Sequence, residues 1–101
     1  MNVIKVFLPL DTGAGLPIPL ETIEGLVKGL ADRFGGATAF TREPADGLWK
    51  TQTTMQRDRI IIVEVVVDQV DQEWWRSYKQ RLEQEFGQDE IMIRVTPCTL
   101  I

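Results

Sequence analysis

The chain has 101 residues, the size of one ordinary domain. It is long enough to form a hydrophobic core and too short to form two domains. Its 11 basic and 15 acidic residues give a net charge of −4 without a basic run, which argues against nucleic-acid binding driven by charge. It has no histidine, so the chain cannot assemble Ser-His-Asp or Cys-His catalysis. Its single cysteine, Cys98, makes a zinc site improbable and favours a reducing compartment.

The N-terminal residues Val3–Leu8 have the composition of a strand and lack the basic leader and cleavage site of a signal peptide. No apolar run approaches the ~20 residues needed to span a membrane. We therefore expect one cytoplasmic domain over residues 1–101, with no membrane partner, no metal and no cofactor.

A first strand is expected over about residues 2–10, followed by a connecting loop over 11–19. The loop has two glycines before a helix, but it lacks the Walker lysine and the glycine spacing of dinucleotide sites. We predict a flexible loop closed by prolines rather than a phosphate cradle.

A helix is predicted over 20–34, because apolar residues recur there at helical spacing and Gly35 follows as a C-terminal cap. Gly25 and Gly29 lie inside it, each costing about 1 kcal/mol relative to alanine. The two glycines are one turn apart and lie on the same side of the helix. Either another part of the protein approaches this side closely, or the helix merely tolerates the glycines.

A second strand is predicted over 37–42, a turn over 44–47 and a further extended segment over 48–51. The polar segment 51–58 is expected to be a hairpin loop, and long loops in compact domains are often functional. Trp49 beside this loop is either a lid on the core or a platform for a ligand.

Residues 60–67 are predicted to form a central strand, since seven of the eight are β-branched and apolar. Alternation places Ile61, Val63, Val65 and Val67 on one face. Both faces are apolar, so both are expected to be covered. Glu64 is the exception, and a covered carboxylate must be paired, solvated or protonated. A structural salt bridge is favoured over a functional role.

A second helix is predicted over 72–86, with Asp71 as its N-cap and Gly87 at its end. Trp75 belongs to the apolar stripe of this helix, whereas Trp74 lies roughly 100° off the stripe and should be partly exposed. A last strand is expected over about 90–96.

The order strand, helix, strand, strand, helix, strand is the split βαβ pattern of the ferredoxin-like fold. We predict an α+β domain, βαββαβ, with a four-stranded antiparallel sheet and both helices on one face. The strands should contribute a core set facing the helices: Ile4, Val6, Leu8, Ile61, Val63, Val65, Val67, Ile91, Ile93 and Val95.

The other sheet face has no helix of its own and is too apolar to be left in water. A second copy of the chain is the simplest cover, so we predict a homodimer. Lys5, Glu64 and Arg94 should meet on three adjacent strands at its centre. They form either a self-paired cluster or a site for an anionic group of a ligand held between subunits.

Phe34-Gly35-Gly36, Gly47-Leu48-Trp49 and Phe86-Gly87-Gln88, with further matches, resemble a group of small uncharacterised bacterial proteins of ferredoxin-like type. The further matches are Thr38, the aliphatic strand, Trp75, Tyr78-Lys79 and Ile91. The resemblance runs from about Ile23 to the C-terminus and rests mostly on helix stops, a turn and core aromatics. It implies a bacterial cytoplasmic origin and brings no established activity.

Three functions compete. The favoured one is a non-catalytic homodimeric binding or interaction module. The alternative is a small cofactor-independent enzyme of the dimeric α+β barrel type acting on a small organic molecule, with Tyr78, Glu64 and Arg94 as acid, base and anion holder. RNA recognition on the open sheet is disfavoured, because Phe7 is its sole aromatic candidate. The candidate ligand-binding residues are Lys5, Glu64, Arg94, Trp49 and Trp74.

Overall fold

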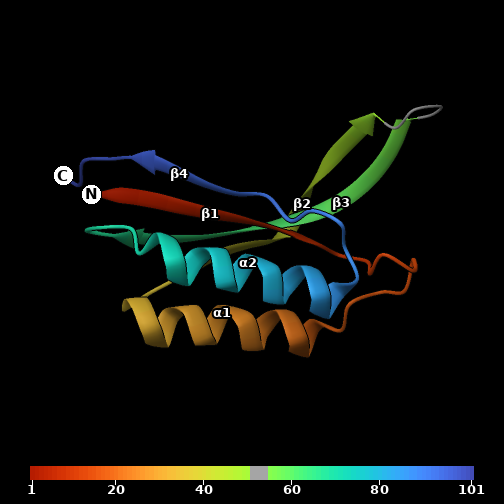
Figure 1. Ribbon diagram of the computed structural model, residues 1–101, viewed down its shortest axis with the longest axis horizontal. Helices are drawn as coiled ribbons and strands as arrows, with labels where there is room; N and C mark the ends of the chain where they lie inside the picture. Colours follow the sequence, from red (N-terminus) through yellow and green to blue (C-terminus); the bar gives the residue numbers. More distant parts are fainter. Residues whose placement is uncertain (51–54) are drawn as a thin grey trace.

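The computed structural model describes the backbone of residues 1–50 and 55–101, and the side chains of residues 1–39 and 59–101. Within the described residues, four strands form one antiparallel sheet in the order β2-β3-β1-β4. Both described helices lie on one side of this sheet (Figure 1). The predicted ferredoxin-like α+β fold is confirmed. The elements are β1 (Asn2–Pro9), α1 (Leu20–Phe34), β2 (Thr38–Lys50), β3 (Met55–Val67), α2 (Gln72–Phe86) and β4 (Ile93–Pro97).

Both helices have the predicted ends, because the signals that set them are local. Asp71 caps α2, its Oδ1 accepting from the backbone N–H of Trp74 at 3.1 Å. Gly35 and Gly87 end the two helices in the left-handed conformation, with φ of 81° and 61°, where a side chain would be strained. Neither helix in the described part of the chain is long and apolar enough to cross a membrane.

The hydrophobic core lies between the sheet and the helices. Alternate residues of β3, Ile61 to Val67, are buried as predicted, and Ile4, Val6 and Leu8 of β1 lie beside them. The helices complete this layer with Ile23, Leu30, Trp75, Tyr78, Leu82 and Phe86. The twin aliphatic strands at the centre of the sheet therefore bury one face within the chain.

The β2–β3 hairpin is longer than the sequence predicts. β2 continues without interruption to Lys50, with a shift of register between Phe40 and Ala45, and β3 begins at Met55. The first part of β3, before Ile60, pairs with β2 alone. In Figure 1 this part of the hairpin rises away from the helices. In a two-stranded ladder the inward backbone groups pair across the strands and the outward ones can face water, whatever the side chains are, so a polar sequence did not have to be a loop.

The loop between β1 and α1 makes backbone hydrogen bonds within itself and to the end of α2. The N–H of Thr12 donates to the carbonyl of Leu16 at 2.7 Å, and that of Gly13 donates to the carbonyl of Phe86 at 2.9 Å. A Cβ at Gly13 would lie 1.8 Å from the carbonyl oxygen of Gly87. Gly13 is therefore required by a backbone-to-backbone contact with the end of α2.

The last strand is shorter than predicted, because β4 begins only at Ile93. Ile91 is buried but lies outside the ladder, its N–H donating to Glu83 Oε2 at 2.8 Å. Val95, predicted to face the helices in the core, is 45% exposed. β4 pairs only with β1, so its outer side has no neighbouring strand to cover it.

Candidate functional site

The sheet face opposite the helices is apolar and carries no helix (Figure 1). Its residues are partly covered or, at Val66 and Arg94, exposed, in contrast to their buried neighbours along β1 and β3. We call this set the open face: Val3, Lys5, Phe7, Ile60, Ile62, Glu64, Val66, Met92 and Arg94. These residues share one face of the sheet, and within the described residues no helix of the same chain lies over it.

Lys5 lies at the centre of the open face, paired in register with Glu64 of β3 and with Arg94 of β4. Its Nζ is 3.5 Å from Glu64 Oε1, and the two side chains are 36% and 28% exposed. An ion pair this accessible to water contributes about 0.2–1 kcal/mol to stability. The predicted salt bridge of Glu64 is thus present but weak in the single chain.

Arg94 does not join that pair. Its guanidinium carbon lies 4.9 Å from the centroid of the Phe7 ring, a cation–π arrangement across the β1–β4 ladder. Among the residues whose side chains are described, no ion pair joins Arg94 to Glu64. The prediction that three side chains meet is therefore wrong for Arg94, because the diagonal neighbour Phe7 offers its guanidinium a ring face.

The helix layer carries a cluster of aromatic side chains. Trp75 is 6% exposed and Trp74 only half-buried, which confirms the predicted helical phase. Trp74 stacks on Tyr78, with ring centroids 4.9 Å apart and planes 13° from parallel. Arg33 of α1 places its guanidinium carbon 4.4 Å from the Trp74 ring centroid. The predicted ligand residue Trp74 therefore lies at the junction of α1 and α2.

A small groove of about 150 Å³ opens between the two helices beside Trp74. A Cβ built at Gly25 or at Gly29 would have no heavy atom within 4 Å, so no neighbour approaches these glycines. The close-approach interpretation of the two glycines is wrong, and they instead leave the groove open. We call this the α1–α2 groove, lined by Gly25, Leu26, Gly29, Leu30, Trp74, Tyr78 and Arg81.

Tyr78 cannot act together with Glu64 and Arg94 in one chain. Burial raises the pKa of Tyr78 to about 12, with Arg81 lowering it and Glu85 raising it further. The phenol therefore stays protonated near neutral pH. It lies in the helix layer, whereas Glu64 and Arg94 lie on the opposite side of the sheet. The acid, base and anion holder proposed for an enzyme do not converge.

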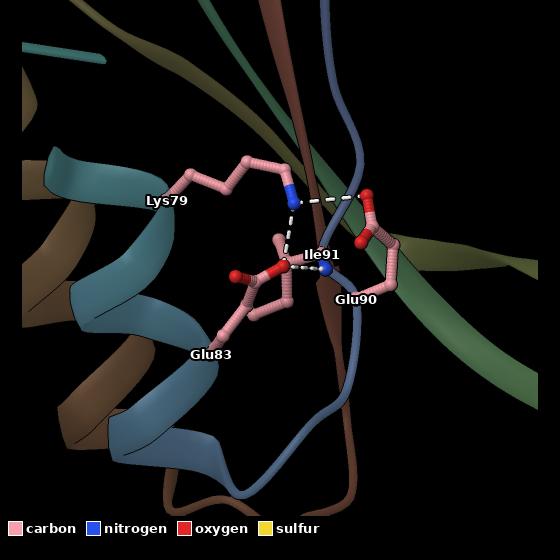
Figure 2. Close-up of polar contacts among 4 residues, drawn as sticks. All are labelled: Lys79, Glu83, Glu90 and Ile91. Carbon is pink, nitrogen blue, oxygen red and sulfur yellow. Dashed lines mark hydrogen bonds and ion pairs between the residues drawn. The ribbon is translucent and has the colours of Figure 1, made fainter. Parts of the chain in front are cut away.

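A polar cluster ties α2 to the segment before β4 (Figure 2). Lys79 contacts both Glu83 and Glu90, and Glu83 also accepts from the N–H of Ile91. The hydrogen bonds from Lys79 and then Ile91 lower the pKa of Glu83. Burial alone would lower the pKa of Lys79, but its two carboxylate partners outweigh burial and raise it.

The sequence analysis did not single out Lys79 and Glu83 as a pair and missed this cluster. Their spacing of four residues was the available signal. The tertiary partners in the 90–91 segment gave no local signal. The cluster is a structural clasp rather than a site, because every member already has a partner.

Two further expectations concern Trp49 and metal binding. The side chain of Trp49 lies outside the part of the chain whose side chains are described, so its role remains a prediction. Among the described residues, no group of three or more cysteine or acidic side chains is arranged to hold a metal ion.

Comparison with known proteins identifies the fold. No family model and no curated protein matches the sequence. A phage SAM lyase in complex with S-methyl-5'-thioadenosine superposes with a TM-score of 0.65 at 11% identity, covering 94% of this chain and 79% of the lyase. The same lyase in its apo state gives 0.60 at 14% identity, covering 94% and 78%.

CutA1 of Pyrococcus horikoshii superposes with a TM-score of 0.59 at 14% identity, covering 100% of this chain and 86% of CutA1. At such identities the likeness establishes the shared α+β architecture and nothing about residues or chemistry. The function must be argued from the surfaces of this chain.

Proposed function

We propose that this protein is a non-catalytic binding or interaction module that works as a homodimer joined through the open face. The observation that supports it is the face of β1 and β3 that neither of the described helices covers, whose residues are mostly apolar. The proposed setting is the bacterial cytoplasm, in keeping with the single cysteine and the resemblance noted above.

The composition of the open face suits a second copy of itself. Phe7 and Ile62 are directly paired in register at its centre, so a two-fold axis there would bring aromatic and aliphatic side chains together. Lys5 and Glu64 already neutralise one another, which lowers the desolvation cost of covering them. Leu20, which is also exposed, belongs to α1, and α1 lies on the helix side of the sheet (Figure 1).

The mass of the protein in solution tests the dimer. Light scattering over a range of micromolar concentrations should give twice the 11.5 kDa chain mass for the wild type. Ile62→Lys should yield a folded monomer, because a lysine cannot be buried unpaired at the dimer centre. Leu20→Lys, a matched change at an exposed residue of α1, should remain dimeric. A wild type that is monomeric throughout would overturn the proposal.

The second candidate is a small cofactor-independent enzyme. A phage SAM lyase shares this architecture, so SAM is the first substrate to test. Because Tyr78 and Glu64 lie on opposite sides of the sheet, an active site would have to combine residues of two subunits or use a different pair of residues. Incubation of the protein with SAM, with loss of SAM followed by chromatography, tests this candidate. Heat-denatured protein is the control, and an unchanged SAM concentration would reject lyase activity.

A further inference from the structure

We propose that the α1–α2 groove binds a small planar organic anion of the aromatic carboxylate class. The proposal goes beyond the dimer and does not depend on it. The groove lies in the helix layer, on the other side of the sheet from the open face (Figure 1).

The walls of the groove favour an aromatic ring. Leu26 of α1 and Trp74 of α2 line it with partly exposed side chains. The buried Tyr78 ring stacks on Trp74 and holds it in place. Trp74 is held further by an edge-to-face contact with Phe34, whose centroid lies 5.2 Å away. The groove has a volume of about 150 Å³, similar to a closed apolar cavity that holds benzene, but it is open to solvent, so a ring bound here would be only partly enclosed.

The two glycines explain why the groove is open. Gly25 and Gly29 are exposed and lie within the 15-residue helix α1, where glycine is unfavourable. Neither has a positive φ or a close neighbour that would require glycine. A larger side chain at either position would project into the groove, so glycine serves here to leave space.

The rim of the groove carries a cation suited to a carboxylate. The guanidinium carbon of Arg81 lies 5.1 Å from the Tyr78 ring centroid, which directs the charged group along the aromatic wall. Arg81 forms no ion pair among the residues with described side chains. A guanidinium binds a carboxylate through two parallel hydrogen bonds, so a ring carrying one carboxylate matches both wall and rim.

Titration of the intact protein with benzoate tests the site, read by the indole N–H signals of the tryptophans in NMR spectra. We expect a Kd of about 1 mM, the range open to so small a ligand. Benzamide, which has the same ring and no charge, should bind roughly tenfold more weakly, because it lacks the charge-assisted hydrogen bonds.

Two variants with matched controls locate the binding. Gly29→Leu fills the groove with a good helix former and should abolish binding, whereas Gln80→Leu adds the same side chain to α2 outside the groove and should not. Arg81→Gln should weaken benzoate roughly tenfold and leave benzamide unchanged. Arg76→Gln removes an exposed cation of α2 that does not line the groove and should change neither.

Three results would overturn the proposal: no benzoate binding at millimolar concentration, unchanged binding in Gly29→Leu, or equal affinity for benzoate and benzamide. The dimer is tested separately. Ile62→Lys should bind benzoate as the wild type does, and Gly29→Leu should keep the wild-type mass.

Discussion

The two faces of β3 are both mainly aliphatic, yet the described helices cover only one of them. Ile61 and Val63 are buried beneath the helices, whereas Ile60 and Ile62, which alternate with them along the strand, are only partly covered. Strand composition thus shows that a face is suited to burial and does not show what buries it. The helices bury one face within the chain, and the open face is the surface through which we propose that a second copy binds.

The largest expected difference is between Trp75 and Trp74, which separate the covered core from its rim. Trp75→Ala should cost about 3–5 kcal/mol of unfolding free energy, because a buried indole in an aromatic cluster is lost. Trp74→Ala should cost much less. Urea denaturation of both variants measures the two losses, and equal losses would contradict the observed helix phase.

Ile61 and Ile62 compare the two faces with the same residue type in the same strand. Ile61→Ala should cost about 2–5 kcal/mol at any protein concentration, since its side chain is 2% exposed within the single chain. Ile62→Ala should cost less in dilute monomer and more where the dimer forms. Thermal melts at several protein concentrations distinguish the two variants. If the stability lost in Ile62→Ala does not change with concentration, the open face is not linked to assembly.

Gly13 and Gly25 contrast a backbone position that is covered with one that is not. Gly13→Ala should destabilise by about 1–3 kcal/mol or more, because its Cβ would collide with the Gly87 carbonyl. Gly25→Ala should stabilise α1 by about 1 kcal/mol, since nothing lies near the new methyl group. The two substitutions should change the free energy of unfolding in opposite directions. A loss of stability in both variants would refute the open groove.

The Lys79–Glu83 clasp adds a pH dependence to the covered side. The pKa of Glu83 is lowered in the folded state, so its stabilisation is present above the ordinary pKa of 4.5 and lost as pH falls through the lowered value. Glu83→Gln should therefore reduce the drop in melting temperature on acidification from neutral pH. Glu24→Gln, on the exposed side of α1, serves as the control. If Glu83→Gln and Glu24→Gln show the same dependence of melting temperature on pH, Glu83 does not contribute to acid sensitivity.

The smallest effect concerns Glu64 on the open face. Glu64→Gln should cost only about 0.2–1 kcal/mol in dilute monomer, because the ion pair with Lys5 remains partly exposed. In the dimer the same pair would be covered, and the loss should grow with concentration. Melting temperature and mass measured together detect this, and a large loss in the monomer would show that Glu64 is already buried.

Some features were determined by the sequence itself. The bounds of both helices, 20–34 and 72–86, follow from apolar spacing and from caps such as Asp71, Gly35 and Gly87. These signals act within one or two turns, so they do not depend on the fold. The element order and the apolar strands then fixed the ferredoxin-like arrangement, including the register that places Lys5 beside Glu64.

Other features were decided only by the tertiary structure, because they depend on groups far apart along the chain. The loop at Gly13 is held by the carbonyl of Phe86, and Arg94 lies on Phe7 rather than on Glu64. Gly25 and Gly29 of α1 line a groove only because the fold places Trp74 and Tyr78 of α2 beside them. Local sequence sets what a segment prefers to be, whereas contacts across the fold decide which of its surfaces remain free.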